Sequence, residues 1–351
     1  MYAMVANYRD EIQQEAIKTA LSKKYGSIGI PMRGGKTKIG LEIANQFNKV
    51  LVSYPNQPIY NSWKDDSEKF GIDISNVTFT THISLSKHDL KLYDCVIIDE
   101  IHDISINQWL YIESNLPIRM YGLSGTLPDR GEKLDYLNLY CPVIYRKTLD
   151  ETTGKLNKDY KITVHLLEPD KRQNLQLKSG KFWSEAQKIA FFERKYTMSR
   201  NFNDMLFLIR AIQDSKTKLD YMKKLSNKID RGLFFVETAK QCEELGFPSY
   251  HSKEPNSEDN LVAFKNGEIN KLATINQLKA GITIHDLNDV VILHCYSSNN
   301  KAAQKLARAL NYVEDQIANI HILGLKGTRD EDWISKGLKD FDDSKITYET
   351  V

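Results

Sequence analysis

The feature that most limits the fold of this chain is the alternation of short apolar runs with helical patterns up to residue 145. Apolar runs with the length of buried strands lie at 27–30, 50–54, 77–80, 95–98, 120–123 and 143–145. Between the first two runs, Ile39, Ile43 and Phe47 recur every fourth residue, as on the buried face of a helix. Strands that alternate with helices indicate a parallel sheet with helices on both faces.

The same alternation returns after a charged, glycine-poor segment at 175–228, where we expect two or more helices. Beyond that segment, strands are expected at 232–236, 271–275, 290–296 and 320–325, and helices at 260–270 and 301–313. We therefore predict an α/β fold with two tandem domains, 1–158 and 159–351, each a mostly parallel sheet flanked by helices. Three roles are open for the segment 175–228: a wedge, a clamp, or packing against the second domain.

Composition narrows the class of protein without naming it. The 48 basic and 46 acidic residues leave a net charge of +2, which neither marks nor excludes a nucleic-acid-binding protein. The four cysteines lie far apart and form no C-x-x-C pair, so neither a zinc knuckle nor a redox motif is indicated. No apolar stretch approaches a membrane span and the first residues lack a signal-peptide pattern, so we expect a cytoplasmic protein.

The tripeptide Gly35-Lys36-Thr37 resembles the end of a phosphate-binding P-loop. The full pattern, G-x-x-x-x-G-K-[ST], has glycine at the position that Ile30 occupies here. A predicted strand precedes the tripeptide and a predicted helix follows it, so backbone N–H groups at the start of the helix would point at the loop. Lys36 would then reach the β- and γ-phosphates, and the Thr37 hydroxyl would bind Mg²⁺.

A second chemical signal is the acid pair Asp99-Glu100, which ends the apolar run at 95–98. Ligands of open α/β sheets bind beyond the carboxyl ends of the strands, so these acids are placed to act on a ligand. Asp99 would hold Mg²⁺, and Glu100 would polarise the water that attacks the γ-phosphate. The alternative is a pair of solvated acids at a strand end, which the P-loop upstream makes the weaker interpretation.

In Asp99-Glu100-Ile101-His102 the chain resembles the DExH motif of superfamily 2 helicases and translocases. The other motifs of that superfamily occur in order, from about Tyr8 to Leu325. They are RDEIQQEAI with Gln13, the segment from Val50 with Pro55 and Trp63, GLSGTLPD, GLFFVET, the stretch through Gly281, and QKLARALN. The second half is most similar to small phage-type DNA helicases of this group.

The resemblance implies two RecA-like domains that bind ATP with Mg²⁺. Catalytic roles fall on Lys36, Asp99, Glu100, Gln304 and Arg308. ATP binding falls on Gln13, Pro31, Met32, Arg33, Gly34, Gly35, Lys36, Thr37, Lys38 and Gly281, with Thr37 and Asp99 as the Mg²⁺ ligands. Coupling of hydrolysis to movement falls on His102, Ser124 and Thr126. Nucleic acid would contact Pro55, Asn56, Gln57, Thr80, Thr81, His82, Thr274 and Asn276, mostly through its backbone.

Three departures from the superfamily pattern concern the second half. An acid usually follows the glycine at Gly281, and Thr283 stands in its place. Ala307 replaces a glycine, and Asn311 replaces the second of two arginines that touch the γ-phosphate. An arginine at a transferring phosphate is worth roughly 1,000-fold or more in rate. The loss predicts slow turnover or a substitute, for which Arg329 and Arg200 are the candidates.

The leading hypothesis is an ATP-dependent helicase or translocase that acts on DNA in the cytoplasm of a bacterial or phage-infected host cell. Two alternatives keep the nucleic-acid partner: an ATP-gated binding or remodelling protein with very weak hydrolysis, and an RNA helicase. A third alternative is an unrelated P-loop enzyme such as a small-molecule kinase. The α/β unit in the second half, with Gln304 and Arg308, argues against that alternative.

Overall fold

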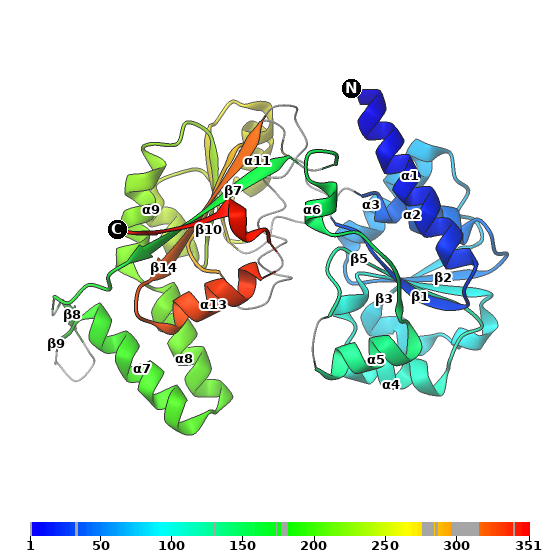
Figure 1. Ribbon diagram of the computed structural model, residues 1–351, viewed down its shortest axis with the longest axis horizontal. Helices are drawn as coiled ribbons and strands as arrows, with labels where there is room; N and C mark the ends of the chain where they lie inside the picture. Colours follow the sequence, from blue (N-terminus) through cyan, green and yellow to red (C-terminus); the bar gives the residue numbers. More distant parts are fainter. Residues whose placement is uncertain are drawn as a thin grey trace. The chain divides into compact units, whose positions relative to one another are not determined.

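Two α/β units make up the chain, one up to residue 156 and the other from Lys158 onward (Figure 1). The structure is a computed structural model. It describes residues 2–31, 34–128, 131–156, 158–172, 174–176, 182–275, 284, 287–295, 316–339 and 341–351.

Unit 1 contains six parallel strands within its described residues, in the order β3-β2-β4-β5-β1-β6. They are β1 (Tyr25–Gly29), β2 (Val50–Tyr54), β3 (Val77–Thr81), β4 (Cys95–Asp99), β5 (Met120–Ser124) and β6 (Val143–Arg146). Each overlaps one of the predicted apolar runs. The predicted α/β fold with a parallel sheet is therefore confirmed for this unit.

The middle of the sheet of unit 1 is buried on both faces, because every residue of β2, β4 and β5 is buried. In β4, Cys95 and Ile97 belong to one core cluster, whereas Val96 and Ile98 belong to another. The first cluster is covered by α1 (Tyr2–Leu21), α2 (Lys36–Ala44) and α3 (Gln57–Phe70). The second is covered by α4 (Ile106–Ser114) and α5 (Glu132–Tyr140). The short elements are η1 (His82–Lys87), η2 (Leu90–Leu92), η3 (Ile101–Asp103) and α6 (Leu149–Thr152).

Unit 2 has a seven-stranded parallel sheet in the part of the chain that is described, in the order β11-β12-β10-β13-β14-β7-β15. The strands are β7 (Asp159–Leu167), β10 (Gly232–Val236), β11 (Ser249–Tyr250), β12 (Lys271–Ile275), β13 (Asp289–Ile292), β14 (Ile317–Leu325) and β15 (Ile346–Thr350). The remaining elements are α10 (Ala239–Leu245), α11 (Ser257–Asn266), α13 (Arg329–Leu338) and η4 (Asp343–Lys345). The helix expected at 301–313 lies outside the described residues.

The segment 175–228 is helical over most of its length, as expected. It contains α7 (Glu185–Ser199), α8 (Phe202–Gln213) and α9 (Lys216–Ser226), preceded by a short antiparallel ribbon of β8 (Leu175–Gln176) and β9 (Phe182–Trp183). Ile189, Leu208 and Leu219 of the three helices share a core cluster with Phe234 and Val291 of the sheet. The segment therefore packs as part of unit 2.

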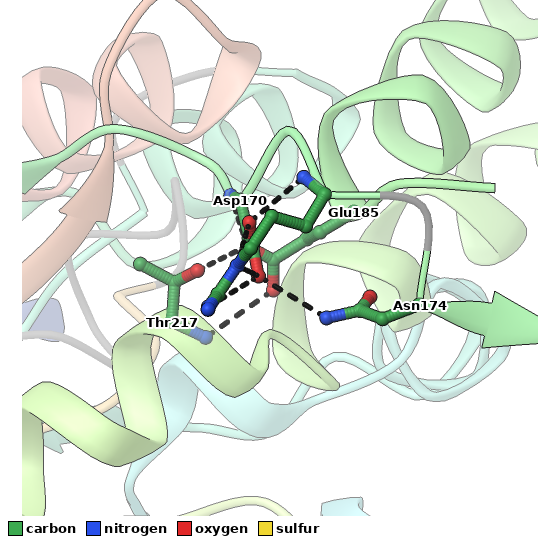
Figure 2. Close-up of polar contacts among 5 residues, drawn as sticks. Asp170, Asn174, Glu185 and Thr217 are labelled. Carbon is green, nitrogen blue, oxygen red and sulfur yellow. Dashed lines mark hydrogen bonds and ion pairs between the residues drawn. The ribbon is translucent and has the colours of Figure 1, made fainter.

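A polar network joins the start of this helical segment to the chain that leaves β7, as Figure 2 shows. The buried Glu185 carboxylate accepts hydrogen bonds from the backbone N–H of Asp170 at 3.0 Å and of Thr217 at 3.3 Å. Arg172 binds the Asp170 carboxylate and lowers the pKa of that group to about 2. Because Glu185 begins α7 and Thr217 lies in the first turn of α9, one carboxylate satisfies donors of two segments.

Candidate nucleotide-binding site

The P-loop runs from the end of β1 to the start of α2. Gly35 precedes α2 with a φ of 81°, in the left-handed region that favours glycine, and no side chain caps the helix. A Cβ atom on Gly34 would lie 2.0 Å from a side-chain carbon of Ile30, so this position also requires glycine. The uncapped N–H groups at the start of α2 are therefore left for a ligand, and phosphate is the group that such a terminus binds.

Ile30 explains the departure from the P-loop pattern. Its side chain is fully buried in the core of unit 1, and its backbone N–H donates to the carbonyl oxygen of Ser124 at 3.0 Å. The position that carries glycine in the general pattern therefore continues the strand here, and the residue packs against Gly34.

Gln13 reaches the P-loop from α1. Its Nε2 donates to the carbonyl oxygen of Gly34 at 3.0 Å, and its side chain is buried. A Cβ atom on Gly35 would lie 2.1 Å from that nitrogen, which shows how closely the amide approaches the loop. Gln13 Oε1 is buried without a hydrogen-bond partner among the described residues. Its contact with the loop is a structural finding, while its contact with ATP stays a prediction.

Asp99 ends β4 as a buried carboxylate with two neutral donors. Its Oδ2 accepts from the indole Nε1 of Trp63 at 2.8 Å, and its Oδ1 accepts from the backbone N–H of Glu100 at 2.9 Å. Burial, followed by the charge of Glu100, raises the pKa of Asp99 to about 6. A nearby cation would favour the ionised carboxylate, so the position suits a group that holds Mg²⁺.

Glu100 has a backbone φ of 49°, a left-handed conformation that costs a non-glycine residue on the order of 1–3 kcal/mol. Its Oε1 lies 3.8 Å from the Nζ atom of Lys36, and its Oε2 lies 3.4 Å from the Nδ1 atom of His102. Strained backbone of this kind is typical of functional sites. The P-loop lysine and the second acid of the DExH motif therefore face each other.

The predicted coupling residues, His102, Ser124 and Thr126, lie together next to Glu100. His102 Nδ1 is 2.7 Å from the Ser124 hydroxyl, which donates to the Thr126 carbonyl oxygen at 2.6 Å and accepts from the Thr126 N–H at 3.1 Å. Because the serine proton is used on Thr126, this pattern assigns a proton to His102 Nδ1. Lys133, which sequence reasoning missed, donates to the His102 carbonyl oxygen at 2.9 Å. A hydrogen-bonded path thus joins the ends of β4 and β5.

A further carboxylate lies beside the other expected Mg²⁺ ligand. Asp66 of α3 accepts a hydrogen bond from the Thr37 side chain, and burial raises the pKa of Asp66. Lys38 of the P-loop pairs with the exposed Asp10 at 3.1 Å. Sequence reasoning did not find Asp66 because no motif marks it. Its signal is helical spacing, since it follows Trp63 by three residues.

The residues present fit a Mg²⁺ ion bound with a nucleotide. Thr37 and Asp99 offer the oxygen ligands, and the buried Oε2 atom of Glu100 has no hydrogen-bond partner in the described part of the chain. No group of three or more histidine, cysteine, aspartate or glutamate side chains that could hold a metal occurs among those residues. Mg²⁺ matches such a sparse site because it usually takes one or two protein ligands together with phosphates and water.

The predicted nucleic-acid contacts of unit 1 divide into exposed and buried groups. Asn56 and Gln57 are exposed at the start of α3, where Asn56 caps the helix by accepting from Ile59 N. Pro55, just before them, is half-buried. Polar groups at this helix start are open to solvent, so they are available to a backbone phosphate.

The other predicted contacts have partners inside the protein. Thr81 caps η1 by accepting from Ser84 N. His82 is buried, its Nδ1 lies 2.7 Å from the Ser53 hydroxyl, and Thr80 beside it is also buried. Thr274 of β12 is fully buried and donates to the Tyr250 carbonyl oxygen. Their contact with nucleic acid stays a prediction.

Several predicted site residues lie outside the described residues. They are Met32, Arg33, Asn276, Gly281, Gln304 and Arg308, together with the departures at Thr283, Ala307 and Asn311. Of the candidate substitute arginines, Arg329 lies 3.7 Å from the Glu193 carboxylate and over the ring of Tyr196. Arg200 also lies over Tyr196 and is exposed.

Two parallel sheets flanked by helices, the first with Lys36 and the Asp99-Glu100 pair near the carboxyl ends of its strands, give the chain the α/β fold of two tandem RecA-like units. No protein-family model matches the chain. It is 24% identical over 366 residues to the DNA 3'-5' translocase XPB2 of Sulfurisphaera tokodaii, covering 91% of this chain and 82% of that protein.

Solved structures agree in fold. The DNA-bound ATP-dependent Type ISP restriction-modification enzyme LlaBIII superposes with a TM-score of 0.63 at 13% identity, over 97% of this chain and 31% of that one. The Hef helicase domain of Pyrococcus furiosus superposes with a TM-score of 0.54 at 14% identity, over 93% and 97%. The chain therefore shares the fold of these structures and is similar in sequence to a DNA translocase, as the resemblance to superfamily 2 helicases and translocases predicts. The likeness to phage-type members stays a prediction.

No helix in the described part of the chain has both the length and the apolar character needed to cross a membrane.

Proposed function

We propose that this protein is an ATP-dependent translocase or helicase that acts on DNA. The observation that carries the proposal is the 3.8 Å approach of the P-loop Lys36 to the DExH residue Glu100, beside the uncapped start of α2. These are the groups that bind and hydrolyse a nucleoside triphosphate in P-loop proteins. The XPB2 relative supports DNA as the partner, since it is named a DNA translocase.

Each group in unit 1 has a distinct role in the proposed reaction. The ammonium group of Lys36 balances charge on the phosphates, and the N–H groups of α2 bind the same phosphates. Thr37 and Asp99 would hold Mg²⁺, which would neutralise charge on the phosphate oxygens. The Glu100 carboxylate accepts a proton from the attacking water, because 23% of its side chain is exposed and its Oε2 atom has no hydrogen-bond partner among the described residues.

His102 links this chemistry to the rest of unit 1. Its Nδ1–H lies within reach of both the Ser124 hydroxyl at 2.7 Å and the Glu100 carboxylate at 3.4 Å. A change of charge at Glu100 during hydrolysis would shift the balance between these two acceptors. We infer that such a shift moves the Ser124–Thr126 loop and so reports the nucleotide state to the nucleic-acid-binding surface.

Gln304 and Arg308 are proposed to complete the site from the second half of the chain, and Asn56 and Gln57 to bind the DNA backbone. Backbone contacts of this kind hold the strand without reading its sequence. Whether the motion separates strands or follows a duplex is the finer point that substrate assays decide.

Lys36→Ala and Glu100→Gln should reduce ATP hydrolysis by roughly 100-fold or more, because they remove phosphate charge stabilisation and the general base. A matched control is Lys49→Ala, which removes an exposed lysine at the start of β2, away from the carboxyl ends of the strands. Phosphate release would be measured with single-stranded, duplex and forked DNA and with RNA. DNA-stimulated hydrolysis in the wild type supports the proposal. Hydrolysis no higher than in Lys36→Ala under every condition would sink it.

A second candidate is an ATP-gated DNA-binding protein with very weak hydrolysis, which Asn311 at the second arginine position favours. It predicts ATP-dependent DNA binding with turnover barely above that of Glu100→Gln. Strong DNA stimulation of phosphate release excludes it. An RNA helicase is distinguished in the same assay by stimulation with RNA but not with DNA.

A further inference from the structure

We propose that Trp63 is a positioning residue that orients the Asp99 carboxylate for the Mg²⁺–nucleotide complex. The inference rests on the proposed function, because it concerns the nucleotide site of unit 1. It goes beyond that function because it assigns a role to the indole N–H of Trp63, which lies on α3 and belongs to neither the P-loop nor the DExH motif.

The Trp63 ring is held rigidly at its place. Its side chain is fully buried, and a Cβ atom on Gly40 of α2 would lie 2.3 Å from the far edge of the indole. Phe79 of β3 packs edge-on against the ring, with the ring centroids 6.0 Å apart. Close packing from α2 and β3 leaves the indole little freedom, so its N–H points in a fixed direction.

The fixed indole N–H donates a hydrogen bond to the Asp99 carboxylate. The Nε1–Oδ2 distance is 2.8 Å, and the second oxygen of the same carboxylate accepts from Glu100 N at 2.9 Å. One donor on each oxygen sets the plane of the carboxylate and leaves further lone pairs open. Both donors are neutral, so the negative charge of Asp99 stays available to a cation, whereas a lysine or arginine partner would cancel it.

The same helix face also reaches the second expected Mg²⁺ ligand. Asp66 follows Trp63 by three residues on α3, and its carboxylate accepts from the Thr37 hydroxyl. A hydroxyl that donates its proton to Asp66 keeps its oxygen lone pairs free for a metal ion. One face of α3 therefore supports both Thr37 and Asp99.

The decisive variant is Trp63→Phe, which keeps an aromatic ring in the core but removes the N–H. The matched control is Trp109→Phe. Trp109 is also buried in unit 1, but it packs on Tyr136 in the core cluster on the other face of the sheet, which does not contain Trp63. Binding of a fluorescent ATP analogue would be titrated with Mg²⁺ and repeated in chelator. Melting temperatures of both variants would be recorded.

Trp63→Phe should raise the Mg²⁺ concentration at half-saturation by about 10-fold, the usual effect of losing a partner of a metal ligand. Its nucleotide affinity in chelator should match the wild type, since the P-loop is untouched. Trp109→Phe should leave the Mg²⁺ dependence unchanged even if it lowers the melting temperature. An unchanged half-saturation in Trp63→Phe, or an equal shift in both variants, would overturn the inference.

A second measurement needs no folded Trp63 variant. The chain has four tryptophans, so ¹⁵N-labelled indoles give four N–H signals, which Trp109→Phe, Trp183→Phe and Trp333→Phe assign by elimination. Adding Mg²⁺ with ADP should move the Trp63 signal more than adding ADP alone. The inference fails if the Trp63 signal ignores Mg²⁺ while the wild type binds the complex. A wild type that binds no nucleotide instead overturns the proposed function.

Discussion

Each of the two units has a lysine–carboxylate pair whose lysine lies in the first turn of a helix, and the two pairs differ in exposure. In unit 1, Lys36 and Glu100 are 3.8 Å apart, and 13% and 23% of their side chains are exposed. In unit 2, Lys218 and Asp330 are 2.9 Å apart and neither side chain is exposed. A long, partly exposed pair can exchange a partner for a phosphate, whereas a short buried pair is closed to any ligand.

The surroundings of the buried pair strengthen this contrast. The backbone N–H of Leu325, at the end of β14, donates to Asp330 Oδ2 at 3.1 Å. His294 Nδ1 lies 3.5 Å from the other oxygen of the same carboxylate. Burial raises the pKa of Asp330, but the charges and hydrogen bonds of Lys218 and His294 together outweigh burial and hold that pKa below its usual range. The same kind of ion pair thus joins structural elements in unit 2 and lines the proposed nucleotide site in unit 1.

The largest effect is expected when the buried pair is broken. Lys218→Met should destabilise the protein by about 3–5 kcal/mol, because it leaves the Asp330 charge buried without its partner. Lys36→Met should change stability by about 1 kcal/mol or less, since water reaches its pair. Urea unfolding followed by circular dichroism measures both. Equal losses in the two variants would contradict the distinction between the pairs.

The next effect concerns hydrolysis rather than stability. Glu100→Gln should lower single-turnover hydrolysis by roughly 100-fold, because the amide cannot accept a proton from water. Nucleotide binding should persist, since Lys36 and the start of α2 are unchanged. Glu132→Gln, which neutralises an exposed acid at the start of α5, serves as the control. A rate within a factor of two of the wild type would remove Glu100 from the chemical step.

Acid should destabilise the two units to different extents, because their buried histidines have different neighbours. Burial lowers the pKa of His165 in unit 2 from 6.5 to about 4, and burial does the same to His82 in unit 1. A histidine with a depressed folded-state pKa binds its proton better when unfolded. Its contribution to stability is therefore lost as pH falls from 6.5 toward 4. In unit 1 the raised pKa of Asp99 acts in the opposite direction.

Without metal or nucleotide, unit 2 should lose about 1–2 kcal/mol between roughly pH 6.5 and pH 4.5, and unit 1 should lose less. Peptide-resolved hydrogen exchange, corrected for the intrinsic pH dependence of exchange, reports each unit separately. His165→Gln should flatten the response of unit 2. Greater acid sensitivity in unit 1 than in unit 2 would show that Asp99 does not offset His82.

The smallest effect belongs to a fully solvated pair. Asp10 binds Lys38 at 3.1 Å, but 60% of the Asp10 side chain is exposed. Asp10→Asn should change the free energy of unfolding by about 0.5 kcal/mol or less, as is usual for surface ion pairs. Together with Lys218→Met, it tests whether burial rather than distance sets the cost of losing a pair. A loss above that range would mean that the contact itself dominates.

Local sequence patterns predicted the central strands but not the edges of the second sheet. β2, β10 and β12 coincide with the expected apolar runs, because both of their faces are buried. β15 was missed since it is an edge strand of mostly exposed residues, and β11 was missed because it has two residues. β7 alternates buried apolar with polar positions, a strand signal that went unused at the junction of the two units.

In the candidate site too, the residues within local motifs could be predicted, whereas contacts between distant parts of the chain could not. Lys36, Thr37, Asp99 and Glu100 stand in motifs, so their neighbourhood followed from strand–helix order. The Trp63–Asp99 contact spans 36 residues and depends on how α3 is rotated about its axis. Lys133 reaches His102 across 31 residues, with no motif around it. Rotation of a helix and the path of a long side chain are set by packing, which a single sequence does not display.

At Glu100 the left-handed backbone lowers the stability of the fold, while the side chain is proposed to act in hydrolysis. Glycine adopts that conformation without strain, so Glu100→Gly would relax the turn after β4 by up to about 1–3 kcal/mol, less the flexibility that glycine adds to the unfolded chain. A laboratory selection for heat resistance alone would therefore tend to discard the acid that we propose as the general base. The proposed role of Glu100 in hydrolysis would account for a residue that the backbone disfavours at this position.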